Sequence, residues 1–169
     1  VAGGLAVLAD TDAHRVLAVG AGDGEPRWAF TADGRVDSPP TIHAGRVLFG
    51  SADGCVYCLR AADGQLIWRF RAAPADLRTV ARDQVESVWP VHGSVLVQNG
   101  VAWAAAGRSS YLDGGITLIG LDPGTGKVIA ETPIRIEHPR GSEGAGERPV
   151  KKLTQNATDG KTFEAPDRS

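Results

Sequence analysis

A repeated eight-residue block constrains the fold of this chain more than any other feature of its sequence. The block Asp-Gly-x-x-x-Trp-x-Phe occurs at residues 23–30 and returns at residues 63–70, about 40 positions later. Two tryptophans, Trp28 and Trp68, therefore stand at equivalent places. Self-similarity at this period is typical of proteins built from stacked or radially arranged units, so we expect the chain to consist of such units.

Each block also follows an apolar segment. A third copy of the unit matches the repeat pattern less completely than the first two. The apolar segments are residues 4–8 and 45–49. The third copy opens at residues 100–104 and closes at residues 120–129, but Ala130 stands where the tryptophan is expected. The sequence therefore contains three recognisable units.

Within the second copy, short apolar runs alternate with turns. Residues 47–49, 55–59 and 65–71 have the composition of strands, and the four-residue segments 51–54 and 61–64 between them end in Asp-Gly. Asp-Gly tolerates the positive φ angles of tight hairpins. We therefore predict an all-β fold, an arc of about three to four β-propeller blades that are each a four-stranded antiparallel sheet.

The residues that lead to each tryptophan resemble the PQQ-type, or quinoprotein-like, propeller repeat, whose pattern is roughly Ala-x-Asp-x-x-Thr-Gly-x-x-x-Trp. The matching segments are residues 18–28, 58–68 and 120–130. The first two keep the glycine and the tryptophan, whereas the third keeps the Asp and the Thr-Gly. The resemblance implies that the tryptophan docks one blade on the next and should be largely buried there. The residues expected at these contacts are Trp28, Trp68, Gly24, Gly64 and Gly126.

A closer resemblance links the chain to propeller proteins of planctomycete-type bacteria. Residues 86–94 and 107–115 carry it. It implies relatives but no activity.

Two segments interrupt the third unit. One is the insertion at residues 74–94, expected to be a long loop, and the other is residues 108–114 inside what should be a tight hairpin. Insertions are where a repeat scaffold acquires a task. If both lie on one face of the ring, they form a polar pocket with aromatic walls for a small ligand or a peptide. Its candidate residues are Trp89, His92, Arg108, Tyr111 and Asp113. The alternative is that the long loop covers an exposed edge and its Arg and Asp side chains pair with each other.

The two cysteines, Cys55 and Cys58, lie in an alternating segment with the pattern of a strand. Residues i and i+3 of a strand point to opposite faces, about 10 Å apart. That separation is too long for a disulfide or a shared metal. We expect two buried, reduced, structural thiols.

Enzyme and scaffold remain as two classes of function. The resemblance to quinoprotein dehydrogenases implies PQQ on the ring axis beside Ca²⁺, held by carboxylate and amide residues, with an Asp as base and adjacent cysteines at the quinone. The cysteines here are not adjacent, and no residue set transfers to such a site. The chain also resembles outer-membrane assembly lipoproteins that share this repeat, and a function of that kind needs only the propeller scaffold. We therefore favour a non-catalytic scaffold or ligand- and protein-binding module without cofactor or metal, and keep a fragment of a PQQ-dependent dehydrogenase as the alternative.

Charge and hydropathy exclude two classes of partner. The chain has 18 Lys and Arg against 20 Asp and Glu, so no basic surface for nucleic acid is expected. No apolar run approaches the roughly 20 residues of a membrane span. The resemblance implies a periplasmic or otherwise extracytoplasmic location.

The repeat also divides the chain. We expect blade units within residues 1–137, a Gly- and Pro-rich linker at 138–150 and a polar tail at 151–169. The blade units are about 1–35, 36–73 and 95–132. Three blades leave two uncovered faces. We expect them to be covered by the remaining blades of a longer protein, with pairing of two copies as the other route.

Overall fold

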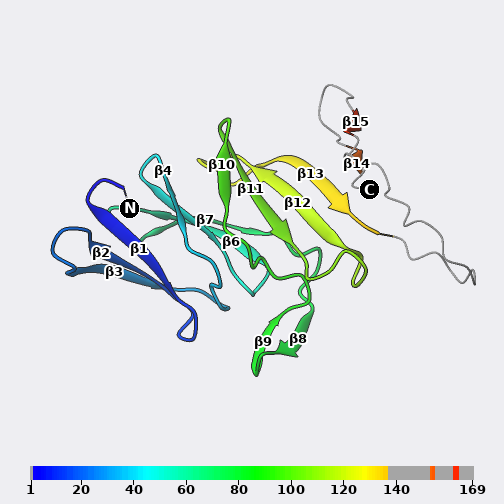
Figure 1. Ribbon diagram of the computed structural model, residues 1–169, viewed down its shortest axis with the longest axis horizontal. Helices are drawn as coiled ribbons and strands as arrows, with labels where there is room; N and C mark the ends of the chain where they lie inside the picture. Colours follow the sequence, from blue (N-terminus) through cyan, green and yellow to red (C-terminus); the bar gives the residue numbers. More distant parts are fainter. Residues whose placement is uncertain (1, 137–152, 155–161, 164–169) are drawn as a thin grey trace, which may run out of the picture.

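In the computed structural model, residues 2–136, 153–154 and 162–163 are described. Every regular element in these residues is a β-strand, and the strands form five antiparallel sheets. The three larger sheets follow one another along the chain as successive blades (Figure 1). The propeller architecture predicted from the repeat is confirmed. The expected linker and most of the expected tail lie outside the described residues, apart from a two-stranded sheet of β14 (Leu153–Thr154) and β15 (Thr162–Phe163).

The first unit has three described strands, and the second and third have four. The first sheet has the order β1 (Leu5–Asp10), β2 (Arg15–Gly20), β3 (Pro26–Thr31). The second has the order β4 (Thr41–His43), β5 (Arg46–Gly50), β6 (Cys55–Arg60), β7 (Leu66–Arg71). The third has the order β10 (Leu96–Gln98), β11 (Val101–Ala106), β12 (Ile116–Leu121), β13 (Val128–Ile134). Strands β4 and β10 contact each other, which identifies them as the inner strands of adjacent blades.

The tryptophans dock neighbouring units in the same way. Trp28 Nε1 donates to the Ala61 carbonyl at 2.9 Å, and Trp68 Nε1 donates to the Pro123 carbonyl at 3.2 Å. Both residues are intermediate in burial, and each lies on the outermost strand of its blade.

A glycine of the next unit lies under each indole. A Cβ built on Gly64 would come within 2.6 Å of the Trp28 ring, and one on Gly126 within 2.7 Å of the Trp68 ring. Both glycines have φ near +70°, where a side chain is strained. Gly24, at the equivalent turn of the first unit, has φ of +71° and nothing within 4 Å of its Cβ position.

The third unit replaces the missing tryptophan from another strand. In the second unit, one row of residues paired across the strands ends on Trp68. The equivalent row of the third unit consists of Trp103 on β11, Gly120 on β12 and Ala130 on β13. A Cβ on Gly120 would meet the Trp103 ring at 2.9 Å, so the indole lies over the glycine. The third unit therefore keeps a tryptophan in this row, but on β11, two strands further inward than the β13 position that is equivalent to Trp68.

The core forms two clusters, one on each side of the second sheet. One lies between the first and second units and contains the stacked rings of Phe49 and Tyr57, whose centroids are 5.1 Å apart. The other lies between the second and third units. Cys55 belongs to the first cluster and Cys58 to the second, and both are buried on β6. The prediction that the thiols point to opposite faces of one strand is confirmed.

Candidate functional site

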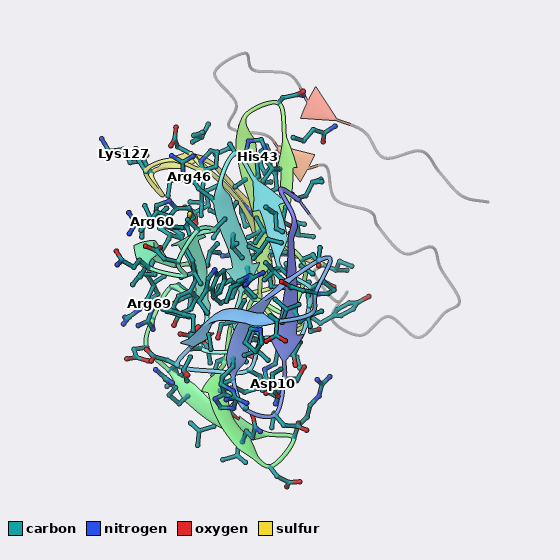
Figure 2. The ribbon with its side chains drawn as sticks, turned by 90° about the vertical axis from the view of Figure 1, so that its left-hand side faces the viewer. Asp10, His43, Arg46, Arg60, Arg69 and Lys127 are labelled. Atoms are coloured by element: carbon teal, nitrogen blue, oxygen red, sulfur yellow. The ribbon has the colours of Figure 1, made fainter. Side chains whose placement is uncertain are left out.

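The first insertion is a hairpin rather than the loop that we expected. Strands β8 (Arg78–Ala81) and β9 (Gln84–Ser87) pair antiparallel and protrude beyond the three sheets in both views (Figures 1 and 2). Their two-residue turn is Arg82–Asp83, with φ of 51° and 59°. Two successive positive φ angles are the geometry of a type I′ turn, whose twist matches that of the flanking strands.

One face of the hairpin is fixed to the body of the molecule. Gln84 Oε1 lies 2.8 Å from Nε2 of His14, which belongs to the first unit. Glu86, two residues further and on the same face, is 2% exposed. The Ser87 amide donates to the Ala52 carbonyl at 2.7 Å. The hairpin follows the second unit in the chain, and these contacts attach it to the first unit as well as to the second.

A buried ion-pair network holds the base of the hairpin. Arg35, 4% exposed, donates through Nη2 to Glu86 Oε2 at 2.8 Å and through Nε to Asp37 Oδ1 at 2.9 Å. Arg108, from the second insertion, forms an ion pair with the other oxygen of Glu86. Two arginines thus neutralise one buried carboxylate, and removal of that carboxylate would leave buried positive charge.

Asp37 connects this network to His92. Its Oδ2 lies 2.5 Å from His92 Nδ1. Burial alone would raise the pKa of Asp37, but the bonds from Arg35 and His92 outweigh it and hold the pKa below its ordinary value. Ser38 also donates to the His92 carbonyl, so the segments that lead into β4 and β10 are joined side by side.

The two insertions contact each other. Arg108 Nη2 donates to the Ser87 carbonyl at 3.0 Å, and Trp89 Nε1 donates to the Asp113 carbonyl at 2.6 Å. Residues 107–115 form the connection between β11 and β12, with Tyr111 and Leu112 exposed at its tip. The structure thus places Trp89, Arg108 and Asp113 together and brings His92 in through the same network.

These contacts already occupy most of the charged groups at the predicted pocket. The carboxylates of Asp37 and Glu86 are already bound by arginine, and Trp89 uses its donor on a backbone carbonyl. A cleft of about 380 Å³ lies at the opposite end of the strands, lined by Gly4, Arg27, Ile42 and Ala61 among others, and by none of the five candidate residues.

Two members of the network were missed at the level of sequence. Arg35 and Asp37 flank Val36 in the connection between the first and second units, where charged residues are common on a surface. Their burial arises from Glu86, 51 positions away from Arg35. The only sequence signal for these two residues is the insertion, because an inserted segment has to pack against the blades. No local sequence pattern indicates which blade residues it contacts.

The family whose description is "Outer membrane protein assembly factor BamB", a PQQ-type repeat family, matches residues 1–160. The chain belongs to this family.

A BamB protein of Burkholderia pseudomallei is 36% identical over 61 residues, which are 35% of this chain and 16% of that protein. The structure of BamB from Moraxella catarrhalis superposes with a TM-score of 0.58 at 19% identity, covering 80% of this chain and 39% of that one. The chain thus spans well under half the length of these BamB relatives.

Quinoprotein structures are similar as well. Quinohemoprotein alcohol dehydrogenase ADHIIG from Pseudomonas putida HK5 gives a TM-score of 0.62 at 20% identity, with 74% of this chain and 18% of that chain covered. A europium-containing methanol dehydrogenase gives 0.64 at 15% identity, with 79% and 23% covered. At these identities the likeness shows the shared blade fold.

Proposed function

We propose that this chain is a non-catalytic part of a BamB-type propeller, in which the two insertions form a rigid platform for a protein partner. The observation that carries the proposal is the network of Arg35, Glu86 and Arg108, which joins both insertions to the blades. A platform held by buried ion pairs keeps its shape without a ligand. Such preorganisation lowers the entropy lost on binding.

The surface beside that network supports a macromolecular partner. Tyr111 and Leu112 are exposed on the second insertion, and Leu77, Val80 and Val85 are exposed on and beside the hairpin. Aromatic and aliphatic residues grouped on projecting segments are typical of interaction surfaces. The family's printed description names an assembly factor of the outer membrane, which supports a protein partner and an extracytoplasmic location. Among the described residues no helix is long and apolar enough to cross a membrane. The likeness to planctomycete-type propeller proteins stays a prediction.

The alternative is part of a PQQ-dependent dehydrogenase. The described residues do not fit the quinone and its metal. Cys55 and Cys58 lie buried on opposite faces of β6, and burial raises the pKa of the Cys58 thiol to about 11. No cluster of three or more His, Cys, Asp or Glu within the described ranges is placed to hold a metal ion. We therefore derive no reaction through PQQ.

Cross-linking tests the proposed function. A photoreactive amino acid at Leu112 should cross-link a single partner of constant mass in the source cells, and the same group at Thr125, in the turn before β13, should not. Equal or no cross-linking from both positions would contradict a binding platform at the insertions. Quinone absorbance and metal content of the purified full-length protein test the dehydrogenase alternative separately.

A further inference from the structure

The outward face of the β8–β9 hairpin exposes two valines beside Arg78. Val80 and Val85 are paired directly across the two strands and are 72% and 58% exposed. Side chains on a strand alternate between faces, so these valines point away from the face that carries Gln84 and Glu86. Leu77, just before β8, is exposed as well. The hairpin is therefore anchored through one face and presents the other to solvent.

Within residues 2–136, the backbone of β8 has an open edge beside these valines. Because the turn has two residues, Ala81 and Gln84 form the hydrogen-bonded pair that closes it, and hydrogen-bonded pairs alternate along the hairpin. The bond from the Val88 amide to the Leu77 carbonyl, at 3.0 Å, fits this alternation. The N–H and C=O groups of Arg78 and Val80 therefore point away from β9. On β9 the corresponding amide of Ser87 is already bound to Ala52.

Arginines outnumber carboxylates beside the open edge. Arg71 and Arg78 are exposed there with Asp76, whereas Arg82, next to Asp83 in the turn, lies 3.8 Å from Asp37. Asp76 lies 3.0 Å from Arg78 and 3.7 Å from Arg71, so the two guanidinium groups share one carboxylate. Charged side chains protect edge strands from unspecific pairing, and they also select a partner of the opposite charge.

We propose that β8 binds an extended, acidic segment of a partner protein by strand addition, with an apolar side chain resting on Val80 and Val85 and an acidic side chain two residues away, on the same face, at Arg78. The proposal deepens the proposed function, since it gives the platform a partner chemistry. Main-chain bonds to Arg78 and Val80 supply affinity, the valines select the apolar residue, and Arg78 selects the acidic one. A second copy of this chain fits less well, because it would bring the same arginines to the same edge.

A defined peptide tests strand addition. The probe is a fluorescent eight-residue peptide, Thr-Val-Thr-Glu-Thr-Val-Thr-Glu, in which valine and glutamate share one face of the extended chain. It is titrated with the 169-residue protein and followed by fluorescence anisotropy. We expect saturable binding with a Kd below about 1 mM. The analogue with lysine in place of glutamate and a version N-methylated at alternate residues should bind at least about tenfold more weakly, because the first reverses the charges and the second removes main-chain donors. No binding, or equal binding of all three peptides, would overturn the proposal.

Two variants at one position separate the backbone from the side chain. Val80→Pro removes the outward N–H without removing a hairpin bond and should weaken binding at least about tenfold. Val80→Thr keeps the N–H and the branched shape and should stay within about threefold of the unchanged protein. Binding that survives Val80→Pro would contradict strand addition. The N-methylated peptide removes the main-chain bonds donated in the other direction, from the peptide to β8 carbonyls, on the unchanged protein, so the test of strand addition does not depend on the folding of the proline variant.

The outcomes also separate this inference from the proposed function. If cross-linking from Leu112 persists while Val80→Pro changes neither it nor peptide binding, the platform stands and strand addition on β8 is wrong. If the protein instead forms a dimer that Val80→Pro abolishes, the occupant of the edge is a second copy and the acidic partner is wrong.

Discussion

At the scale of single residues, the contact between blades is a tryptophan that lies on a glycine. The indoles of Trp28 and Trp68 contact Gly64 and Gly126, and each also donates a hydrogen bond to a carbonyl of the next unit. The glycine is required twice, because its φ is positive and because a Cβ would enter the ring. Gly24 has the same φ but no ring above it, which makes it a matched control.

We predict that Gly64→Ala destabilises the chain more than Gly24→Ala does. Both changes place a Cβ at positive φ, which costs about 1–2 kcal/mol. Only Gly64→Ala also forces the Trp28 ring to move, which adds about 1–3 kcal/mol of overpacking. The comparison needs only the urea midpoints of the two variants. Equal losses would mean that the indole does not dock there in solution.

The residue scale also predicts how stability depends on pH. The pKa of Asp37 is below its ordinary value in the folded chain, so the folded state binds this proton less readily than the unfolded state does. Its contribution is therefore present above about pH 4, the ordinary range of an aspartate, and is lost as the pH falls through the lower folded value.

Asp37→Asn should accordingly lower the free energy of unfolding at neutral pH and flatten its decline below about pH 4. Denaturation in urea at a series of pH values measures both effects. A decline as steep in Asp37→Asn as in the unchanged protein would contradict the role of this carboxylate.

At the scale of elements, the β8–β9 hairpin is held by its charged base rather than by apolar packing. Its large apolar residues face solvent, whereas Glu86 is buried between Arg35 and Arg108. A buried ion pair adds little net stability when complete, but loss of one partner is costly. Substitution of Glu86 should therefore lower the stability of the fold, whereas substitutions at the exposed ion pairs of the hairpin should change it little.

We predict that Glu86→Gln costs about 3 kcal/mol, because it leaves two arginines without their shared counter-charge. Asp76→Asn removes a carboxylate from an exposed ion pair beside the same hairpin and should cost about 0–1 kcal/mol. Thermal unfolding of both variants gives the comparison. Similar losses would show that the network is not buried in solution.

Most elements of the blades could be predicted from the sequence, because their turns and strands are encoded locally. Asp-Gly turns and alternating apolar residues around Trp68 mark β6 and β7 to within a residue. The hairpin in the first insertion was missed because Arg82–Asp83 adopts a type I′ turn without glycine or asparagine. The core of the network was missed for a different reason, since the burial of Arg35 depends on a residue far away in the chain.

At the scale of the whole molecule, each terminal blade of the arc keeps an exposed outer part, although β14 contacts β13 on the third unit. On the first unit Gly24 lies open. On the third unit, β13 exposes Val128 and Ile129. Propellers have about four to eight blades, so we predict that these outer parts meet further blades, either of the same protein or of a second copy.

Pairing of two copies would place the third unit of one copy against the first unit of the other. Gly24 would then need an indole from β13, but that strand carries Ala130, and the substitute Trp103 lies two strands further inward. Both joints of a six-bladed ring would therefore lack the contact that Trp28 and Trp68 provide elsewhere. We predict that the 169-residue chain does not form a discrete dimer at micromolar concentration. Light scattering over a range of concentrations measures this, with Gly24→Ala as the control that should leave the measured molar mass of a monomer unchanged. A stable dimer that Gly24→Ala weakens would show instead that a second copy closes the ring through this face.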